Sequence, residues 1–310
     1  MLKNRPAEVA RTPVGVATMA RYLRAWSLMP LALIMSSHVA SSRVGGFVQA
    51  LALAQLKIDP VLVPTVMFGR HPGWGAPGGA SVPVEAFQGV LDGVEANGLF
   101  GLVDVVITGY FASAGQVKAA AKAIDTIRAR RSPGAYTPKP RIIIDPIMGD
   151  AGKGLYVLGE VAEAIVSDLL PRADLITPNV WELERITGMQ IRDPQTVRQA
   201  ARLLGKPVLV SSVPRGAEIG VVYADANEAW LAAHQKAPNA PSGTGDLLVA
   251  LYAAALVENQ PISYALARAV GGVAETVTAA QTWEASELPI VAMGQRIRQT
   301  TPAVRIERLI

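Results

Sequence analysis

Apolar runs alternate with amphipathic stretches along the chain from residue 31 onward. The runs are almost uninterrupted in Val, Ile and Leu, which is typical of strands buried on both faces of a parallel sheet. They predict strands at 31–36, 60–66, 104–109, 141–146 and 206–212. The amphipathic stretches predict helices at 44–57, 83–97, 115–131, 159–170 and 193–205. Such alternation indicates a doubly wound α/β domain.

The pattern changes after residue 217. Two runs, at 218–225 and 228–235, are joined by a short Ala-Asn turn and predict an antiparallel hairpin. Three helical stretches are predicted after it, at 243–258, 261–281 and 286–299. Two loops rich in Gly and Pro cover 69–83 and 132–140, and the first is long enough to act as a functional flap.

The formal net charge of +4 comes from one end of the chain. Residues 1–30 carry five basic side chains against one acidic side chain, and the other 280 residues carry 24 of each sign. Charge therefore gives no support to a nucleic-acid partner. We expect residues 1–30 to be a basic extension, either disordered or preceding the true start of the protein, and residues 31–310 to form one domain.

The absence of cysteine from all 310 residues excludes disulfides, thiolate metal sites and a cysteine nucleophile. Half of the residues are apolar and only 17% are charged, so the chain can bury a large core. No stretch approaches the roughly 20 uncharged apolar residues of a membrane span. We therefore expect a cytoplasmic protein without membrane partners.

The segment PSGTGDLLVALYAAAL (241–256) carries the clearest chemical signal. Gly243, Thr244 and Gly245 can turn their backbone N–H groups toward one point, since no Cβ blocks a close approach at the glycines. The N-terminus of the predicted helix adds partial positive charge, which favours an anion. Asp246 stands beside it and could accept a proton from a hydroxyl that attacks a bound phosphate. A tight turn followed by a favourable acid explains the same residues without function.

A second segment, IIIDPIMGD (142–150), places two aspartates at the end of a predicted strand. Asp145 ends the strand and Asp150 follows a turn. Two carboxylates at the carboxyl end of a strand suit a hydrated divalent cation that binds ATP phosphates. A turn with solvated acids is the alternative. Lys153, between two glycines, is either a phosphate contact or a solvated loop charge.

The third segment, LITPNVWELERITG (175–188), follows the same scheme. Thr177 ends a strand, while Asn179 and Glu182 begin a helix. Asn179 and Glu182 would face the crevice that Asp145 faces, because the carboxyl ends of parallel strands lie at one edge of a sheet. An N-cap role explains Asn179 equally well.

The order of these motifs, DPIMGD, then TPNVWEL, then GTGD, resembles the ribokinase-like superfamily. Over residues 31–300 the chain resembles pyridoxal kinases through SSHV, PTVMF, HPGW, ITGY, LVSS and ELPIVAMGQRI as well. The resemblance implies a three-layer α/β fold, with a central, mostly parallel sheet flanked by helices. It also implies ATP-dependent phosphorylation of the 5′-hydroxymethyl group of pyridoxal, and of pyridoxine or pyridoxamine, in vitamin B6 salvage. Mg²⁺ is the implied cofactor, K⁺ a candidate second ion, and a homodimer the implied assembly.

The resemblance assigns roles to matched residues on the acceptor side. Ser37 is similar to the residue that hydrogen-bonds the pyridine ring, and Val44 and Tyr110 would line its pocket. His71 and the loop after it would close over the acceptor. Asp246 would remove the proton from the hydroxymethyl group.

Other matched residues would surround the triphosphate. Those implied at the divalent cation are Asp145, Asp150 and Thr177. Those implied at the nucleotide are Asp145, Asn179, Glu182, Ser211 and Thr244, and the implied anion hole consists of Gly243, Thr244 and Gly245.

Three positions depart from the family pattern. Ser42 and Gly46 replace the first glycine and the asparagine of G-x-V-G-N after SHV, and Pro72 replaces a threonine that contacts the ring. All three lie on the acceptor side, so phosphoryl transfer is better supported than the identity of the acceptor. The alternatives are a hydroxymethylpyrimidine kinase of thiamine metabolism, which commonly has Cys in place of Asp246, and a nucleotide-binding or vitamin-binding homologue without turnover.

Overall fold

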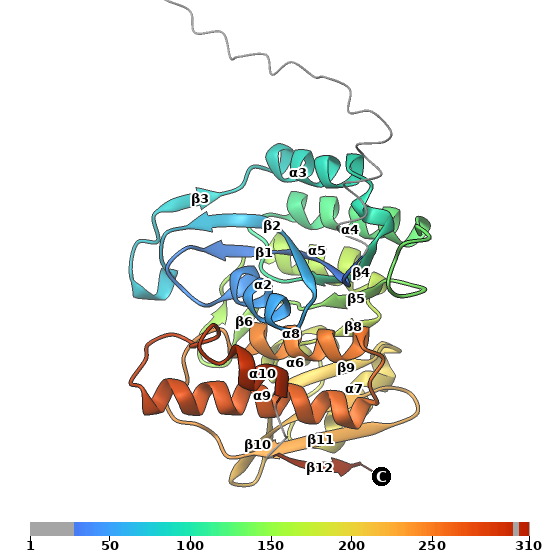
Figure 1. The fold of residues 1–310 in the computed structure, drawn as a ribbon. Helices are drawn as coiled ribbons and strands as arrows, with labels where there is room; N and C mark the ends of the chain where they lie inside the picture. The colour runs from blue at the N-terminus through green and yellow to red at the C-terminus, as the bar shows by residue number, and fades with distance from the viewer. Residues whose placement is uncertain (1–27, 300–303, 310) are drawn as a thin grey trace, which may run out of the picture.

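A mostly parallel sheet runs through the middle of the molecule, as a computed structural model of residues 28–299 and 304–309 shows (Figure 1). Its strand order is β12-β11-β10-β9-β8-β5-β4-β1-β2-β3, and the six strands from β9 to β2 are parallel. The strands are β1 (Leu31–Val39), β2 (Asp59–Phe68), β3 (Gly79–Ser81), β4 (Val103–Thr108), β5 (Arg141–Ile144), β8 (Leu175–Ile176), β9 (Val208–Arg215), β10 (Glu218–Ala224), β11 (Ala229–His234) and β12 (Arg305–Arg308).

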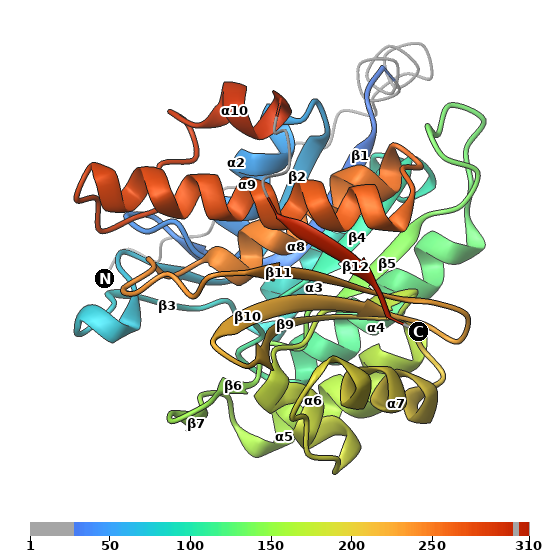
Figure 2. The same ribbon diagram turned by 90° about the horizontal axis from the view of Figure 1, so that it is seen from below.

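Helices cover both faces of the sheet, which gives three layers (Figure 2). One face is covered by α2 (Gly45–Gln55), α8 (Thr244–Val257), α9 (Ile262–Thr282) and α10 (Gly294–Gln299). The other is covered by α3 (Val84–Ala96), α4 (Ala114–Ala129), α5 (Gly159–Ala164), α6 (Val180–Thr187) and α7 (Pro194–Leu204). The expected three-layer α/β architecture is confirmed.

Strand β1 shows why its sequence is apolar throughout. Leu31, Leu33 and Met35 pack into the core beneath α3 to α7, whereas Ala32 and Ile34 pack into the core beneath α2 and α8. All five side chains are fully buried. Successive side chains of a strand point to opposite faces, so a strand with two covered faces needs apolar residues at every position.

Local signals set both ends of α6, a helix near the cavity described below. Asn179 accepts a hydrogen bond from the Glu182 backbone N–H, and the Glu182 side chain accepts one from the Asn179 N–H, which is a capping box at the start of α6. Gly188 ends the helix in the left-handed conformation. The N-cap explanation of Asn179 is therefore correct.

The last predicted helix is shorter than expected. The sequence predicts a helix at 286–299, but α10 covers only Gly294–Gln299. Pro289 interrupts the segment, because it has no N–H to donate. Leu288 and Ile290 are each 1% exposed and pack into the core beneath α2 and α8 from an irregular backbone.

Several further boundaries differ from the predictions. The helix predicted at 159–170 is α-helical only to Ala164 and then continues as a π-turn over Ile165–Leu169. The loop predicted at 69–83 contains β3, which pairs antiparallel with β2. Two short strands, β6 (Gly149–Asp150) and β7 (Gly154–Leu155), form a separate hairpin.

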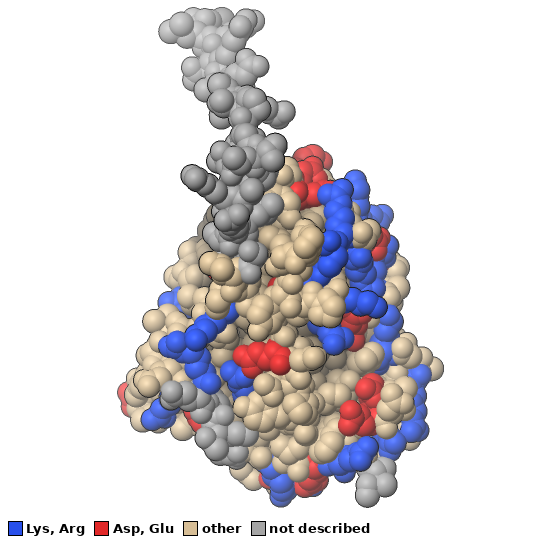
Figure 3. All heavy atoms as spheres, turned by 45° about the vertical axis from the view of Figure 1, so that its right-hand side comes forward, with Lys and Arg blue, Asp and Glu red and all other residues tan. Residues whose placement is uncertain are grey.

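The basic extension predicted at 1–30 lies, for residues 1–27, outside the described residues. Within the described part, no helix is both long and apolar enough to cross a bilayer. On the face drawn in Figure 3, basic side chains lie beside acidic ones at several places. Ion pairs of partly exposed side chains in the described part include Arg128–Asp174 and Arg172–Asp125.

Asp104 connects the starts of β1 and β4 to the loop after α4. It is 1% exposed, and its carboxylate accepts hydrogen bonds from the Leu31 N–H, the Thr137 N–H and the Arg131 guanidinium. Removing one partner of a buried network leaves the other groups without hydrogen bonds, which is the costly case.

We expect Asp104→Ala to lower the free energy of unfolding by roughly 3–5 kcal/mol, because the Arg131 charge and the Leu31 N–H both lose their partner. Asp125→Ala is the matched control, since it breaks a surface pair with Arg172 and should cost less than about 1 kcal/mol. Denaturant unfolding of both variants measures the difference. Equal losses would contradict the role of Asp104.

Candidate active site

A cavity of about 320 Å³ lies where β5, β8 and β9 meet the N-terminus of α8. All residues that the sequence predicts at the nucleotide, the cation and the anion hole line this cavity. They are Asp145, Asp150, Thr177, Asn179, Glu182, Ser211, Gly243, Thr244, Gly245 and Asp246. Their proximity follows from the parallel sheet, because each segment follows a strand or precedes a helix at the same edge.

The GTGD loop requires glycine at its first position. Gly243 has φ = 92°, a conformation that residues with a Cβ rarely adopt. A Cβ there would stand 2.0 Å from the carbonyl oxygen of Arg43, so the loop packs directly against the turn before α2. Thr244 begins α8, and the first backbone N–H groups of this helix have no partner within the helix. The loop can therefore bind an anion.

Asp246 stands in the first turn of α8, and its two carboxylate oxygens differ. Oδ2 accepts a hydrogen bond of 2.8 Å from the Gly45 N–H, whereas Oδ1 is buried without a partner. Burial raises the pKa of Asp246 to about 6, and the hydrogen bonds from the Gly45 N–H and from its own N–H oppose that rise. One oxygen is thus held in place while the other can accept a proton.

Asp145 is buried near other carboxylates. Burial raises its pKa well above the ordinary range, and the charges of Glu182 and Asp246 raise it further. The Thr177 hydroxyl lies close enough to lower the pKa slightly, although Thr177 Oγ1 makes no hydrogen bond of good geometry. A cation bound here would relieve the repulsion among these carboxylates.

Glu182 and Asn179 hold the neighbouring loop. Glu182 Oε1 accepts the N–H groups of Met148 and Gly149, and the Asn179 side-chain amide donates to the Gly149 carbonyl at 2.9 Å. Burial raises the pKa of Glu182 to about 7, although these backbone N–H groups oppose the rise. Both residues shape the loop that ends in Asp150, and their predicted contacts with a nucleotide stay predictions.

The oxygen donors in this cavity suit a magnesium ion that is shared with phosphate and water, rather than an ion held by protein side chains alone. Within the described ranges, no three His, Asp or Glu side chains lie close enough to bind one ion together. Asp145, Asp150 and Thr177 nevertheless supply oxygen atoms to one cavity. Mg²⁺ commonly takes only one or two carboxylates from a protein and completes its shell with phosphate oxygens and water.

Several lining residues were not predicted as site residues from the sequence. Tyr156, Ser212 and Ile147 line the cavity, and burial together with the nearby carboxylates raises the pKa of Tyr156. Ser212 has φ = 62°, an unusual value for a residue with a Cβ, at an irregularity in the pairing of β9 with β10. The motif LVSS contained Ser212, but only the bulge turns this residue toward the cavity. Lys153 lines the cavity as well.

Four of the residues predicted on the acceptor side do not line this cavity. Ser37 and Tyr110 follow the apolar parts of β1 and β4, and Val44 is the N-cap of α2. His71 begins the short helical turn Pro72–Trp74, where its Nδ1 accepts the Gly73 N–H at 3.0 Å. None of the four lines the cavity. Gly45 contacts both Ser37 and Asp246. Its N–H donates to Asp246 Oδ2, and a Cβ on it would stand 2.0 Å from Ser37 Oγ. Their roles stay predictions.

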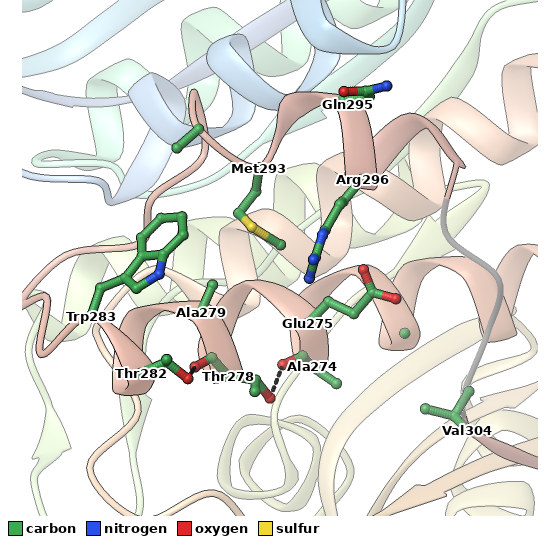
Figure 4. A pocket seen from close by; sticks show the side chains of 12 residues that line it. Ala274, Glu275, Thr278, Ala279, Thr282, Trp283, Met293, Gln295, Arg296 and Val304 are labelled. Atoms are coloured by element: carbon green, nitrogen blue, oxygen red, sulfur yellow. Dashed lines mark hydrogen bonds between the residues drawn. The ribbon is translucent and has the colours of Figure 1, made fainter.

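A larger cavity, of about 540 Å³, lies between α9 and α10 (Figure 4). Two polar residues in its wall, Thr278 and Thr282, donate their hydroxyls to carbonyls of α9 itself. The wall contains one carboxylate, Glu275, and the guanidinium of Arg296 extends toward it. This cavity lacks the converging carboxylates and the anion loop, so we assign the candidate active site to the smaller one.

Comparisons with known proteins identify relatives of this chain. A model of the phosphomethylpyrimidine kinase family matches residues 102–290. The chain is 34% identical over 241 residues to the pyridoxine/pyridoxal/pyridoxamine kinase of Bordetella avium. This alignment covers 75% of this chain and 79% of that protein.

Solved structures are similar along almost the whole chain. Pyridoxal kinase from Entamoeba histolytica has a TM-score of 0.82 at 24% identity, covering 91% of this chain and 100% of that one. Pyridoxal kinase from Leishmania donovani in complex with ADP and pyridoxamine has a TM-score of 0.83 at 23% identity, covering 90% and 99%. The expected fold class is therefore confirmed.

We expect Asp145→Asn to stabilise the metal-free protein at pH 8. Burial and the neighbouring carboxylates disfavour the charged form of Asp145, and the amide of Asn is neutral. A carboxyl whose pKa is raised by folding makes the fold less stable as pH rises above its unfolded pKa of about 4. The gain should be about 1 kcal/mol, roughly 2–4 °C in Tm, at pH 8 and smaller at pH 5. Thermal unfolding in EDTA at both pH values measures it.

Asp150→Asn is the control for this prediction, because Asp150 is exposed. Its stability should stay close to that of the wild type at both pH values. An Asp145→Asn protein that is less stable at pH 8 would mean that the carboxylate makes a net favourable interaction in the fold.

Proposed function

We propose that this chain, which belongs to the pyridoxal kinase family, transfers the γ-phosphoryl group of ATP to the 5′-hydroxymethyl group of pyridoxal. The products are pyridoxal 5′-phosphate and ADP. Pyridoxine and pyridoxamine carry the same hydroxymethyl group, and the relative from Bordetella avium is named for all three. The physiological role proposed is vitamin B6 salvage.

The observation that carries the proposal is the state of Asp246 beside the anion loop. Its Oδ2 is held by the Gly45 N–H, and its Oδ1 has no partner. A pKa of about 6 leaves the carboxylate mostly ionised at pH 7, yet makes it more basic than an ordinary aspartate. A general base for an alcohol needs an ionised, available oxygen next to the phosphate site.

The proposed reaction uses few protein groups. The acceptor oxygen forms a bond to the γ-phosphorus as the bond to the β,γ-bridging oxygen breaks, and Asp246 Oδ1 takes the hydroxyl proton. ADP leaves with the electron pair of the broken bond. The backbone N–H groups of the GTGD loop, with the partial positive charge at the N-terminus of α8, stabilise the charge on the transferred group.

The nucleotide side of the cavity supports ATP and Mg²⁺ as reaction partners. Asp145, Asp150 and Thr177 would hold the ion, and Thr177 Oγ1 and the crowded Asp145 carboxylate both gain a partner when it binds. When bound, Mg²⁺ neutralises charge on the phosphate oxygens. Ser211 and Thr244 would contact the nucleotide.

A second candidate acceptor is a hydroxymethylpyrimidine. The matching family model is described as phosphomethylpyrimidine kinase, and Ser42, Gly46 and Pro72 depart from the pyridoxal kinase pattern on the acceptor side. A binding protein without turnover is less well supported, because such a protein has no use for the unpartnered Oδ1 of Asp246.

The proposal has several further features, of which the homodimer and the use of K⁺ rest on family resemblance. The protein would act in the cytoplasm as a homodimer, with small molecules as its partners and neither nucleic acid nor a membrane among them. K⁺ would assist as a monovalent cation. Light scattering tests the dimer, and activity in Na⁺ compared with K⁺ buffer tests the cation.

We expect ADP release with Mg²⁺ and K⁺ to rise above the blank when pyridoxal is added, and Asp246→Asn to lower kcat by about 10²–10⁴-fold through loss of the base. ATP binding should change little, because the anion loop and the nucleotide side stay intact. Coupled ADP assays with pyridoxal, pyridoxine, pyridoxamine and hydroxymethylpyrimidine measure turnover, and calorimetry measures ATP binding.

The outcomes separate the candidates. Turnover with the pyrimidine alone would keep the chemistry and move the protein to thiamine metabolism. Near-normal turnover by Asp246→Asn would remove Asp246 as the base. ATP binding without turnover for every acceptor would favour the homologue that only binds.

A further inference from the structure

Two carboxylates from distant parts of the chain accept hydrogen bonds at the N-terminus of α2. Its N-cap, Val44, has no polar side chain, and its first turn contains no acidic residue. Asp246 Oδ2 accepts the Gly45 N–H, and Glu287 accepts hydrogen bonds from the residues just before. Carboxylates at this position satisfy N–H groups that lack helical partners and interact favourably with the helix dipole.

Glu287 uses both of its oxygens in this contact. Oε2 accepts the Arg43 N–H at 2.6 Å, and Oε1 accepts the Ser42 hydroxyl at 2.6 Å. The residues that follow anchor it, because Leu288 and Ile290 are each 1% exposed. A carboxylate bound through both oxygens on an anchored segment fixes the position of the turn that it contacts.

The turn of residues 42–45 packs tightly against the active site. On one side, the Arg43 carbonyl lies so close to Gly243 that a Cβ there would stand 2.0 Å away. On the other, Gly45 has φ = 60° and lies against Ser37. A displacement of this turn therefore moves the Gly45 N–H relative to Asp246 and also shifts the anion loop.

We propose that Glu287 is a positioning residue for the proposed reaction: by holding the turn at 42–45, it keeps the Gly45 N–H on Asp246 Oδ2, so that Oδ1 faces the acceptor hydroxyl. The proposal rests on the proposed function. Glu287 does not line the nucleotide cavity, so its effect reaches the reaction through Gly45 and Asp246.

Ser42 contributes directly to the contact with Glu287. It stands where the family pattern has a glycine, and its hydroxyl is the donor to Glu287 Oε1. The departure therefore adds a second hydrogen bond to the one that the Arg43 N–H makes. Ser42 is 1% exposed, which removes competition from water for this bond.

Steady-state kinetics with pyridoxal and ATP tests the proposal. We expect Glu287→Ala to lower kcat by about 10–100-fold, the size expected for misplacing a reacting group, with less than about a 3-fold change in KM for ATP. Ser42→Ala removes one of the two bonds and should fall between this variant and the wild type. Glu284→Gln is the control, because it removes a charge from an exposed residue of the same segment and should behave as the wild type.

Hydrogen–deuterium exchange gives a readout that does not depend on turnover. Glu287→Ala should raise deuterium uptake in the peptide covering residues 42–47, and Glu284→Gln should not. Unchanged uptake would overturn the holding role, and raised uptake with a normal kcat would overturn the positioning role. A loss of activity through a raised KM for ATP alone would also overturn it. An inactive wild type would contradict the proposed function instead, and exchange would still decide whether Glu287 holds the turn.

Discussion

Buried carboxylates held by backbone N–H groups determine how the active-site edge of this fold is organised. Glu182 accepts three backbone N–H groups, and Asp246 accepts that of Gly45. A backbone amide orients a carboxylate without neutralising it, whereas an Arg or Lys partner would supply a full opposite charge. Burial raises the pKa of Asp145, and the negative charge that the cavity keeps raises it further and favours the binding of a divalent cation.

The same principle explains the close approach of α2 and α8. Asp246 belongs to the first turn of α8 but binds the first N–H of α2, so one side chain serves the N-termini of two helices. This requires the backbones to approach each other, and glycine at position 243 permits it, since a Cβ there would lie 2.0 Å from the Arg43 carbonyl oxygen. The GTGD motif therefore has a packing requirement in addition to its anion site.

The sequence predicted the features that local patterns determine. Runs of Val, Ile and Leu identified the central parallel strands, and the capping box of Asn179 and Glu182 spans only three residues. It did not predict β12, which lacks an apolar run and exists through its pairing with β11. The contact between Ser42 and Glu287 joins residues 245 positions apart, and no local pattern encodes such a pair.

The two sides of the site come from different parts of the chain. Apart from Asp246, the predicted acceptor residues all precede residue 111, and those of the nucleotide side all follow residue 144. Asp246 is where these parts meet, because it lies in the late part and is held by Gly45 from the early part. Under the proposed function, a change near α2, such as serine at position 42, would therefore affect turnover through the proposed base. The same turn contains Val44, which is predicted to line the pocket of the pyridine ring, so under the proposed function it would contribute to both selection of the acceptor and activation of its hydroxyl.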